Sequence, residues 1–217
     1  MYTVGNQIVE VIRLHQGLSQ KDAKKSALEI MRLVGIHTPE KSFKSYPHEM
    51  SGGMRQRIMI AMALVCKPDI LIADEPTTAL DVTIQAQVLD LMRQLRKSIN
   101  TAIILITHDL GVVAELADRV IVMYAGQIVE EIMVNELFEN CEHPYSKGLL
   151  QSIPPMSEDV NRLNTINGVV PASNKMPSGC RFHPRCVECM RICETDSPPE
   201  IRINDTHKVR CWLERGV

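Results

Sequence analysis

Pro-Asp-Ile-Leu-Ile-Ala-Asp-Glu-Pro-Thr-Thr-Ala-Leu-Asp, residues 68–81, is the stretch that decides the fold of this chain. The apolar run at residues 70–73 is typical of a strand buried on both faces. It ends abruptly in two adjacent carboxylates, Asp74 and Glu75. In an open α/β sheet, ligands lie beyond the carboxyl ends of the strands, so this pair is placed to meet a metal ion and an attacking water. Taken alone, the pair fits a polar turn or a helix cap equally well.

Three neighbouring motifs favour the first interpretation. Residues 51–57 read Ser-Gly-Gly-Met-Arg-Gln-Arg, residues 79–81 read Ala-Leu-Asp, and residues 107–109 read Thr-His-Asp. In this order and spacing, the motifs and the central stretch resemble the signature loop, Walker B strand, D-loop and switch histidine of ATP-binding-cassette (ABC) ATPases. The residues of these motifs are similar to those of the oligopeptide and dipeptide importer branch. Met54 stands where the family signature usually has glutamine, a departure that this branch shares.

The resemblance implies ATP hydrolysis and gives three residues a role in it. Asp74 is expected to hold Mg²⁺ through water, because this ion prefers oxygen ligands and keeps much of its hydration shell. Glu75 is expected to be the general base that polarises the water attacking the γ-phosphate of ATP. His108 matches the switch histidine, whose imidazole contacts the γ-phosphate and senses its loss, although a lone histidine is more often structural.

The loop Ser51-Gly52-Gly53 is interpreted as a phosphate cradle. Its glycines let backbone amides approach a phosphate, Ser51 adds a hydroxyl donor, and the helix that follows directs its positive end to the same place. By resemblance, this loop closes over the γ-phosphate held by a second ATPase subunit, which implies a head-to-tail dimer. Asp81 is expected at the dimer seam, as the cap of a helix beginning near Val82, or in both roles.

Composition excludes several classes of protein. The chain has 217 residues, of which 45% are hydrophobic, so it can build a sizeable core. A net charge of -2 does not indicate a protein that binds nucleic acid. The longest apolar run, at residues 58–66, is far shorter than the roughly 20 residues of a spanning helix, and we find no signal peptide. We expect a peripheral protein on the cytoplasmic face of the membrane.

Apolar periodicity predicts alternating helices and strands. Helices are predicted at residues 4–14, 20–34 (capped by Ser19), 55–66, 82–96 and 110–117, with strands at 70–73, 102–106, 119–123 and 127–131. This alternation implies a mainly parallel sheet with helices on its faces. The strand at 127–131 is expected to be a short returning strand after the turn at residues 124–126. We expect an α/β protein with a partial P-loop NTPase core, divided into the remainder of a helical subdomain (1–49), the C-terminal half of the ABC ATPase core (50–152) and a small cysteine-rich extension (153–217).

Five of the seven cysteines lie between Cys180 and Cys211, which favours a metal or cluster site over disulfides in a reducing compartment. Spacing alone does not distinguish Zn²⁺ from an iron–sulfur cluster. The extension resembles that of peptide-importer ATPases, some of which carry a 4Fe–4S cluster. The resemblance implies four ligands and leaves Cys189 spare; the ligands are Cys180, Cys186, Cys193 and Cys211. Cys66 and Cys141 stand alone in the sequence, and we interpret them as small buried or incidental residues.

No Gly-x-x-x-x-Gly-Lys-Ser/Thr phosphate loop occurs in the sequence, and no glutamine loop is found. We therefore expect a truncated or split form of a longer subunit. The resemblance implies two membrane permease subunits and, indirectly, an external peptide-binding protein as partners. Two alternatives stay open: an ATPase of an importer for nickel or another small solute, and a non-catalytic metal-binding or assembly fragment.

Overall fold

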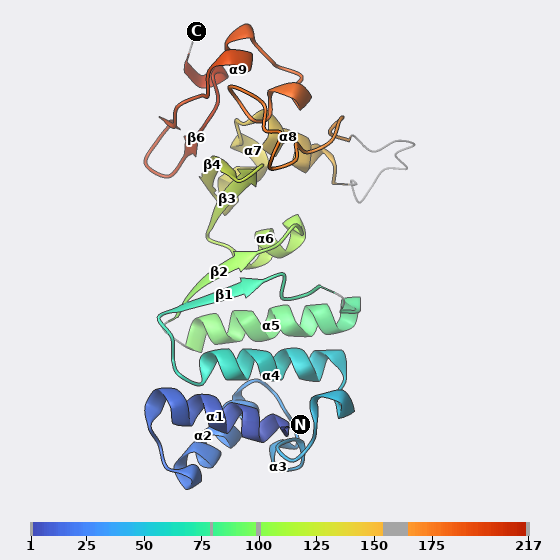
Figure 1. The fold of residues 1–217 in the computed structure, drawn as a ribbon, viewed down its shortest axis with the longest axis vertical. Helices are drawn as coiled ribbons and strands as arrows, with labels where there is room; N and C mark the ends of the chain where they lie inside the picture. The colour runs from blue at the N-terminus through green and yellow to red at the C-terminus, as the bar shows by residue number, and fades with distance from the viewer. Residues whose placement is uncertain (1, 79, 99–100, 154–164, 216–217) are drawn as a thin grey trace. The chain divides into compact units, whose positions relative to one another are not determined.

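The computed structural model describes residues 2–78, 80–98, 101–153 and 165–215. Ala79 of the predicted D-loop and residues 154–164 of the predicted extension lie outside these ranges. The chain forms two compact units, an N-terminal unit at Met1–Val112 and a C-terminal unit at Val113–Val217 (Figure 1). The three predicted domain boundaries remain a prediction. No helix within the described ranges has both the length and the apolar character needed to cross a membrane.

The N-terminal unit follows the predicted alternation closely. Its elements are α1 (Val4–Gln16), α2 (Gln20–Leu33), α3 (Pro39–Ser42), a 3-10 turn (Pro47–Glu49), α4 (Gly52–Leu64), β1 (Ile70–Asp74), α5 (Val82–Ser98) and β2 (Ala102–Ile106). Ser19 caps α2 as predicted, since its hydroxyl accepts a hydrogen bond from the amide of Asp22. The predicted start of the helix at 55–66 was wrong, because α4 begins three residues earlier, at Gly52.

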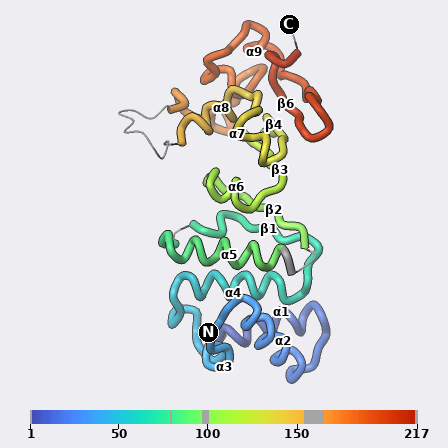
Figure 2. The backbone as a smooth tube through the Cα atoms, turned by 180° about the vertical axis from the view of Figure 1, so that it is seen from behind, coloured from blue at the N-terminus to red at the C-terminus, as the bar shows by residue number. Residues whose placement is uncertain are grey.

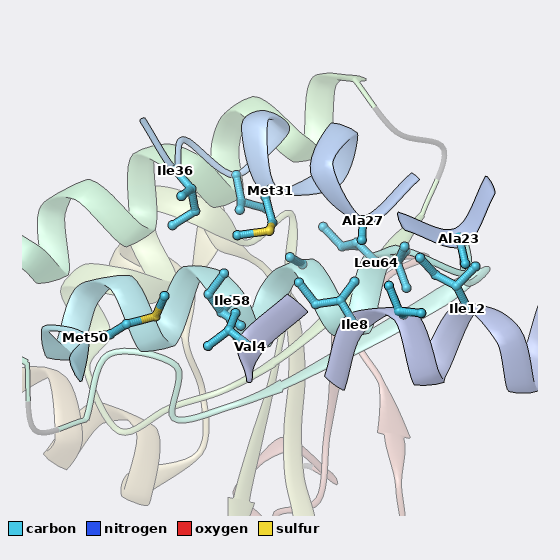
Figure 3. Packing of buried hydrophobic residues seen from close by; sticks show 14 of the residues in the cluster. Val4, Ile8, Ile12, Ala23, Ala27, Met31, Ile36, Met50, Ile58 and Leu64 are labelled. Atoms are coloured by element: carbon cyan, nitrogen blue, oxygen red, sulfur yellow. The ribbon is translucent and has the colours of Figure 1, made fainter. Parts of the chain in front are cut away.

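Helices α1, α2 and α4 enclose the main core of this unit (Figure 3). Ile8 and Ile12 of α1 are fully buried against Ala27 and Met31 of α2 and Ile58 of α4. Figure 2 shows α4 between the α1 and α2 pair and α5. The apolar face of α5 is buried as its spacing predicted, and its members are Val88, Leu91, Met92 and Leu95. The core therefore fixes the direction of the two helices that flank the predicted site.

Strands β1 and β2 pair in parallel, with Ile70 opposite Ala102 and Asp74 opposite Ile106. Leu71 packs toward the helical core, but Ile72 on the opposite face is 64% exposed. The expectation of strands buried on both faces was therefore wrong for this pair in the described part of the chain. An unbroken apolar run shows that both faces suit burial, but it does not show that both are covered.

In the C-terminal unit, the strand at 127–131 returns antiparallel to the strand at 119–123 as predicted, but the mainly parallel pairing expected of the sheet is not found in its described residues. Its sheet has the order β3-β4-β6-β5 and is antiparallel throughout. The elements after β2 are α6 (Leu110–Leu116), β3 (Arg119–Tyr124), β4 (Gln127–Met133), α7 (Val134–Asn140), α8 (Pro144–Gln151), a 3-10 turn (His183–Arg185), α9 (Arg191–Thr195), β5 (Ile201–Arg202), β6 (Lys208–Val209) and a 3-10 turn (Leu213–Arg215). A tight turn at Ala125 and Gly126 joins β3 to β4, since both residues have positive φ.

A buried carboxylate joins the parts of this unit. Glu130 of β4 is 1% exposed, and its Oε1 lies 2.8 Å from Nε2 of His207, just before β6. The same side chain accepts hydrogen bonds from the backbone amides of Glu142 and His143 at the start of α8. Because a buried carboxylate is costly without such partners, this arrangement ties β4, α8 and the C-terminal segment together.

Candidate functional site

The structure brings Glu75 and His108 together at the carboxyl ends of β1 and β2. The backbone amide of Glu75 donates to the carbonyl of Ile106 at 2.8 Å, which extends the parallel pairing by one residue. His108 follows two residues after Ile106, and its Nδ1 lies 3.0 Å from Oε1 of Glu75. Parallel strands therefore place a carboxylate and an imidazole side by side at one edge, as the predicted roles require.

The Glu75 carboxylate is held in an ionised form. The hydroxyl of Thr78 donates to Oε2 at 2.6 Å. This hydrogen bond and that of His108 lower the pKa of Glu75, with Thr78 the larger cause. The side chain of Glu75 is 42% exposed and that of His108 is 81% exposed, so both are open to a ligand and to water. A deprotonated, accessible carboxylate has the state that a general base needs.

Asp74 is the last residue of β1 and is exposed beside Glu75. An accessible carboxylate at this edge fits the hard oxygen ligand that Mg²⁺ prefers. Across the described ranges, no three His, Cys, Asp or Glu side chains gather into a metal-binding group. The role of Asp74 as a ligand of Mg²⁺ stays a prediction.

Ser51, Gly52 and Gly53 form a helix start rather than the loop predicted from the glycines. Ser51 is the N-cap of α4 and accepts a hydrogen bond from the amide of Met54, while both glycines belong to the first turn. A Cβ on Gly53 would lie 2.6 Å from Cγ2 of Ile84 in α5. Helix packing therefore accounts for this glycine. The free amides at the start of α4 are still suited to an anion.

A cavity of about 290 Å³ adjoins the start of α4. Ser51, Gly53 and Arg57 contribute from α4, and Ile84 and Gln87 from α5; the segment 35–38 completes the wall. Arg57 has a structural role, because its guanidinium donates a hydrogen bond to the carbonyl of Val34 at 2.7 Å. The predicted signature residues thus line a hollow rather than a flat helix end.

Asp81 performs the capping role predicted as one of its two functions. Its Oδ1 accepts a hydrogen bond from the amide of Ile84 at 3.0 Å, and its carbonyl accepts one from Gln85. These contacts satisfy amides in the first turn of α5. The other role, at a dimer seam, stays a prediction.

Sequence reasoning missed Thr78, Gln85 and Asp109 near the site. Asp109 accepts hydrogen bonds from the amides of Gly111 and Val112, so it caps α6 and fixes the residue after His108. Gln85 of α5 donates to the other oxygen of Asp109 at 3.3 Å, which links the α5 start to the histidine loop. Two signals for these roles were present in the sequence. The hydroxyl of Thr78 lies three residues after the carboxylate of Glu75, and Asp109 lies two residues before Gly111 of α6.

The cysteine thiols are neighbours without forming a preformed metal site. Burial raises the pKa of the Cys186 thiol to about 12, and the nearby thiols of Cys211, Cys180 and Cys189 add to the shift. The thiol of Cys189 donates to the carbonyl of Met190 at 3.6 Å. Electrostatic interaction reaches farther than a coordination bond, and none of these described thiols joins a metal-binding group. The expected zinc or 4Fe–4S centre therefore receives no direct support.

Two known families match separate regions of the chain. The family described as "ABC transporter" matches residues 2–78, and the family "Oligopeptide/dipeptide transporter, C-terminal region" matches residues 129–193. The oligopeptide transport ATP-binding protein AppD of Bacillus subtilis (strain 168) is 54% identical over 211 residues, which cover 97% of this chain and 64% of AppD. The dipeptide transport ATP-binding protein DppD of the same strain is 50% identical over 212 residues, covering 98% of this chain and 63% of DppD. The chain thus spans about two thirds of the length of these relatives.

A solved structure extends the likeness to the fold. The dimeric, post-hydrolysis structure of the ATP-binding cassette MJ0796 bound to ADP and Pi is 28% identical, with a TM-score of 0.53. The match covers 62% of this chain and 57% of that chain. The site geometry, the two matching families and these relatives lead to one conclusion: the chain belongs to the ABC transporter ATPases and carries the C-terminal region of the oligopeptide/dipeptide transporters.

Proposed function

We propose that this chain is the ATP-hydrolysing part of a subunit that powers peptide import. The observation that carries the proposal is the contact of Glu75 with His108 at the ends of parallel strands β1 and β2. The names of the relatives, an oligopeptide and a dipeptide transport ATP-binding protein, support the choice of peptides as substrates. Nothing in these names favours nickel or another small solute.

The proposed reaction uses few protein groups. Glu75 accepts a proton from water as the water oxygen bonds to the γ-phosphorus, and the bond from that phosphorus to the bridging oxygen breaks to give ADP and phosphate. His108, which is exposed beside Glu75, contacts the γ-phosphate. Asp74 holds Mg²⁺, which neutralises phosphate charge when bound.

The remaining predicted residues act between subunits in this proposal. The amides at the start of α4, with Ser51, Gly52 and Gly53, face the γ-phosphate bound by a second ATPase subunit in a head-to-tail dimer. Asp81 lies at the seam between the two subunits. The dimer works on the cytoplasmic face of the membrane with two permease subunits, which receive peptides from an external binding protein.

A chimera tests the proposal, because these 217 residues contain no phosphate-loop sequence. The chain replaces the region of AppD that it matches, so AppD supplies the rest of the protein. We expect MgATP hydrolysis by the chimera and at least a hundred-fold loss in the Glu75→Gln variant, about the contribution of a general base. Glu139→Gln, an exposed glutamate of α7, is the matched control.

Unchanged ATP hydrolysis in Glu75→Gln would contradict the proposed role of Glu75 as the general base. Hydrolysis that depends on Glu75 but is insensitive to His108→Ala would instead remove only the sensing role of the histidine. Peptide uptake by cells in which the chimera replaces AppD tests the transport part separately, since hydrolysis without uptake would contradict the proposed substrate.

We also propose that Cys180, Cys186, Cys193 and Cys211 bind a 4Fe–4S cluster, with Zn²⁺ as the alternative. The mutual influence of the thiols supports this, but raised thiol pKa values mean that a metal must displace protons to bind. Metal analysis of anaerobically purified chain decides: about four irons support the cluster and one zinc the alternative. Absence of both contradicts the metal site and, with it, the non-catalytic metal-binding function.

A further inference from the structure

The turn after β1 folds a hydroxyl back onto the proposed base. The amide of Thr78 donates to the carbonyl of Glu75 at 3.1 Å, which closes a four-residue turn with Pro76 at its second position. Glu75 has a φ of 44°, in the left-handed region that a residue with a side chain rarely adopts. This backbone places Oγ1 of Thr78 at 2.6 Å from Oε2 of Glu75.

The two oxygens of Glu75 have different partners. Oε2 accepts from Thr78, while Oε1 lies 3.0 Å from Nδ1 of His108. Thr78 belongs to the same turn as Glu75, whereas His108 comes from the segment after β2. The bond to Thr78 is therefore local, and its geometry does not depend on the segment that carries His108.

We propose that Thr78 is a positioning residue, whose hydroxyl holds one oxygen of Glu75 so that the other faces His108 and the attacking water. This inference rests on the proposed function, in which Glu75 is the base. A hydrogen bond from a hydroxyl to a carboxylate is short and charge-assisted, so it restricts an exposed side chain that otherwise samples several rotamers.

NMR of the 217-residue chain tests the contact without any need for activity. Scalar couplings report the χ1 rotamers of Glu75 in the wild type and in Thr78→Val, which keeps the side-chain shape but removes the donor. We expect one dominant χ1 rotamer of Glu75 in the wild type and averaging over several rotamers in Thr78→Val, and we expect Thr78→Ser to restore the wild-type couplings. Thr77→Val, at the adjacent threonine, is the matched control and leaves the couplings unchanged.

Equal Glu75 couplings in the wild type and in Thr78→Val would overturn the inference. Amide spectra show whether each variant keeps the fold of the N-terminal unit. Thr78→Ala provides a second variant without the donor, and its result stands if Thr78→Val does not fold.

The AppD chimera separates this inference from the proposed function. In Thr78→Val we expect kcat to fall roughly ten-fold, a part of the contribution of a general base, with the KM for ATP unchanged. Thr78→Ser reverses this loss of kcat. Hydrolysis that requires Glu75 but ignores Thr78→Val contradicts the positioning role alone. Hydrolysis that ignores Glu75→Gln contradicts the proposed function, while the rotamer couplings of Glu75 still report on Thr78.

Discussion

At the residue scale, Glu75 is held in a strained backbone conformation. Its positive φ is accompanied by a backbone hydrogen bond to Ile106 and by the turn that Thr78 closes. Such conformations persist only where their surroundings enforce them, and they concentrate at functional sites. The site therefore gives up some stability to direct a carboxylate away from the strand.

Two substitutions measure this strain. Glu75→Gly and Glu75→Ala both remove the carboxylate, but only glycine adopts positive φ without a steric cost. We expect the glycine variant to show the higher urea midpoint of unfolding. Equal midpoints would mean that the turn relaxes in both variants and that Glu75 stores no strain.

His143 gives the C-terminal unit a dependence on pH. Burial lowers the pKa of its imidazole from 6.5 to about 4. Its Nδ1 accepts the hydrogen bond from the amide of Tyr145 that caps α8, and a protonated ring has no lone pair for that bond. The unfolded chain takes up this proton near pH 6.5 and the folded chain only near pH 4, so stability falls as pH decreases through this window.

We expect the free energy of unfolding of this unit to decrease by about 3 kcal/mol between pH 7 and pH 4 through His143. Chemical denaturation followed by the single tryptophan, Trp212, measures the change. Asparagine also caps helices but does not titrate, so His143→Asn reduces the slope. His15→Asn, at an exposed position, keeps it. A slope that survives His143→Asn would assign the pH dependence to other groups.

At the element scale, the packing of α4 against α5 depends on one glycine. An added methyl group at Gly53 meets Ile84 at 2.6 Å, whereas at Gly52 its nearest neighbour is Leu80 at 3.5 Å, an ordinary contact. We expect Gly53→Ala to cost about 1–3 kcal/mol of stability, as overpacking does. Gly52→Ala costs less, because alanine is the better helix former.

Urea denaturation of the two alanine variants tests this difference. Adding Ile84→Ala to Gly53→Ala removes the opposing atom, so the double variant loses less stability than the two single changes together. Additive losses would show that Gly53 is required for another reason, such as access to its amide.

The helices of the N-terminal unit were predictable because burial on one side leaves a period in the sequence. Ile8, Ile12, Met31 and Leu91 are buried where that period places them. The start of α4 was not predictable in the same way, since glycines indicate a loop and only their packing against α5 shows why a helix tolerates them. Strands β5 and β6 contain two residues each, too few to produce an alternating pattern.

At the scale of the whole molecule, the sequence predicted which motifs share an edge but not what covers each surface. Glu75 and His108 meet because parallel strands end together, a consequence of connectivity that the motif order already contains. In the C-terminal unit, the hairpin of β3 and β4 was predictable from its turn, but the addition of β6 depends on pairing between Glu130 and Val209, which are far apart in sequence. Such long-range pairing leaves no local signal.

The exposed face of β1 and β2 has a consequence for solubility. Ile72 is 64% exposed and Ile104, paired with it in the register, is 49% exposed. Adjacent exposed isoleucines on a two-stranded sheet are a liability for self-association. We expect the double variant Ile72→Thr/Ile104→Thr to associate less than the wild type in sedimentation experiments, because threonine keeps the β-branched shape that strands favour and removes apolar surface.

Ile58→Thr is the contrasting variant, since Ile58 is 4% exposed in the core of the same unit. Burying its hydroxyl without a partner destabilises the fold by about 1–3 kcal/mol, so this variant unfolds more readily and gains no solubility. The two results together decide whether the exposed strand face or partial unfolding drives association. If Ile72→Thr/Ile104→Thr associates as strongly as the wild type while Ile58→Thr associates more, the unfolded chain is the species that self-associates. The isoleucines of β1 and β2 are then not the contact.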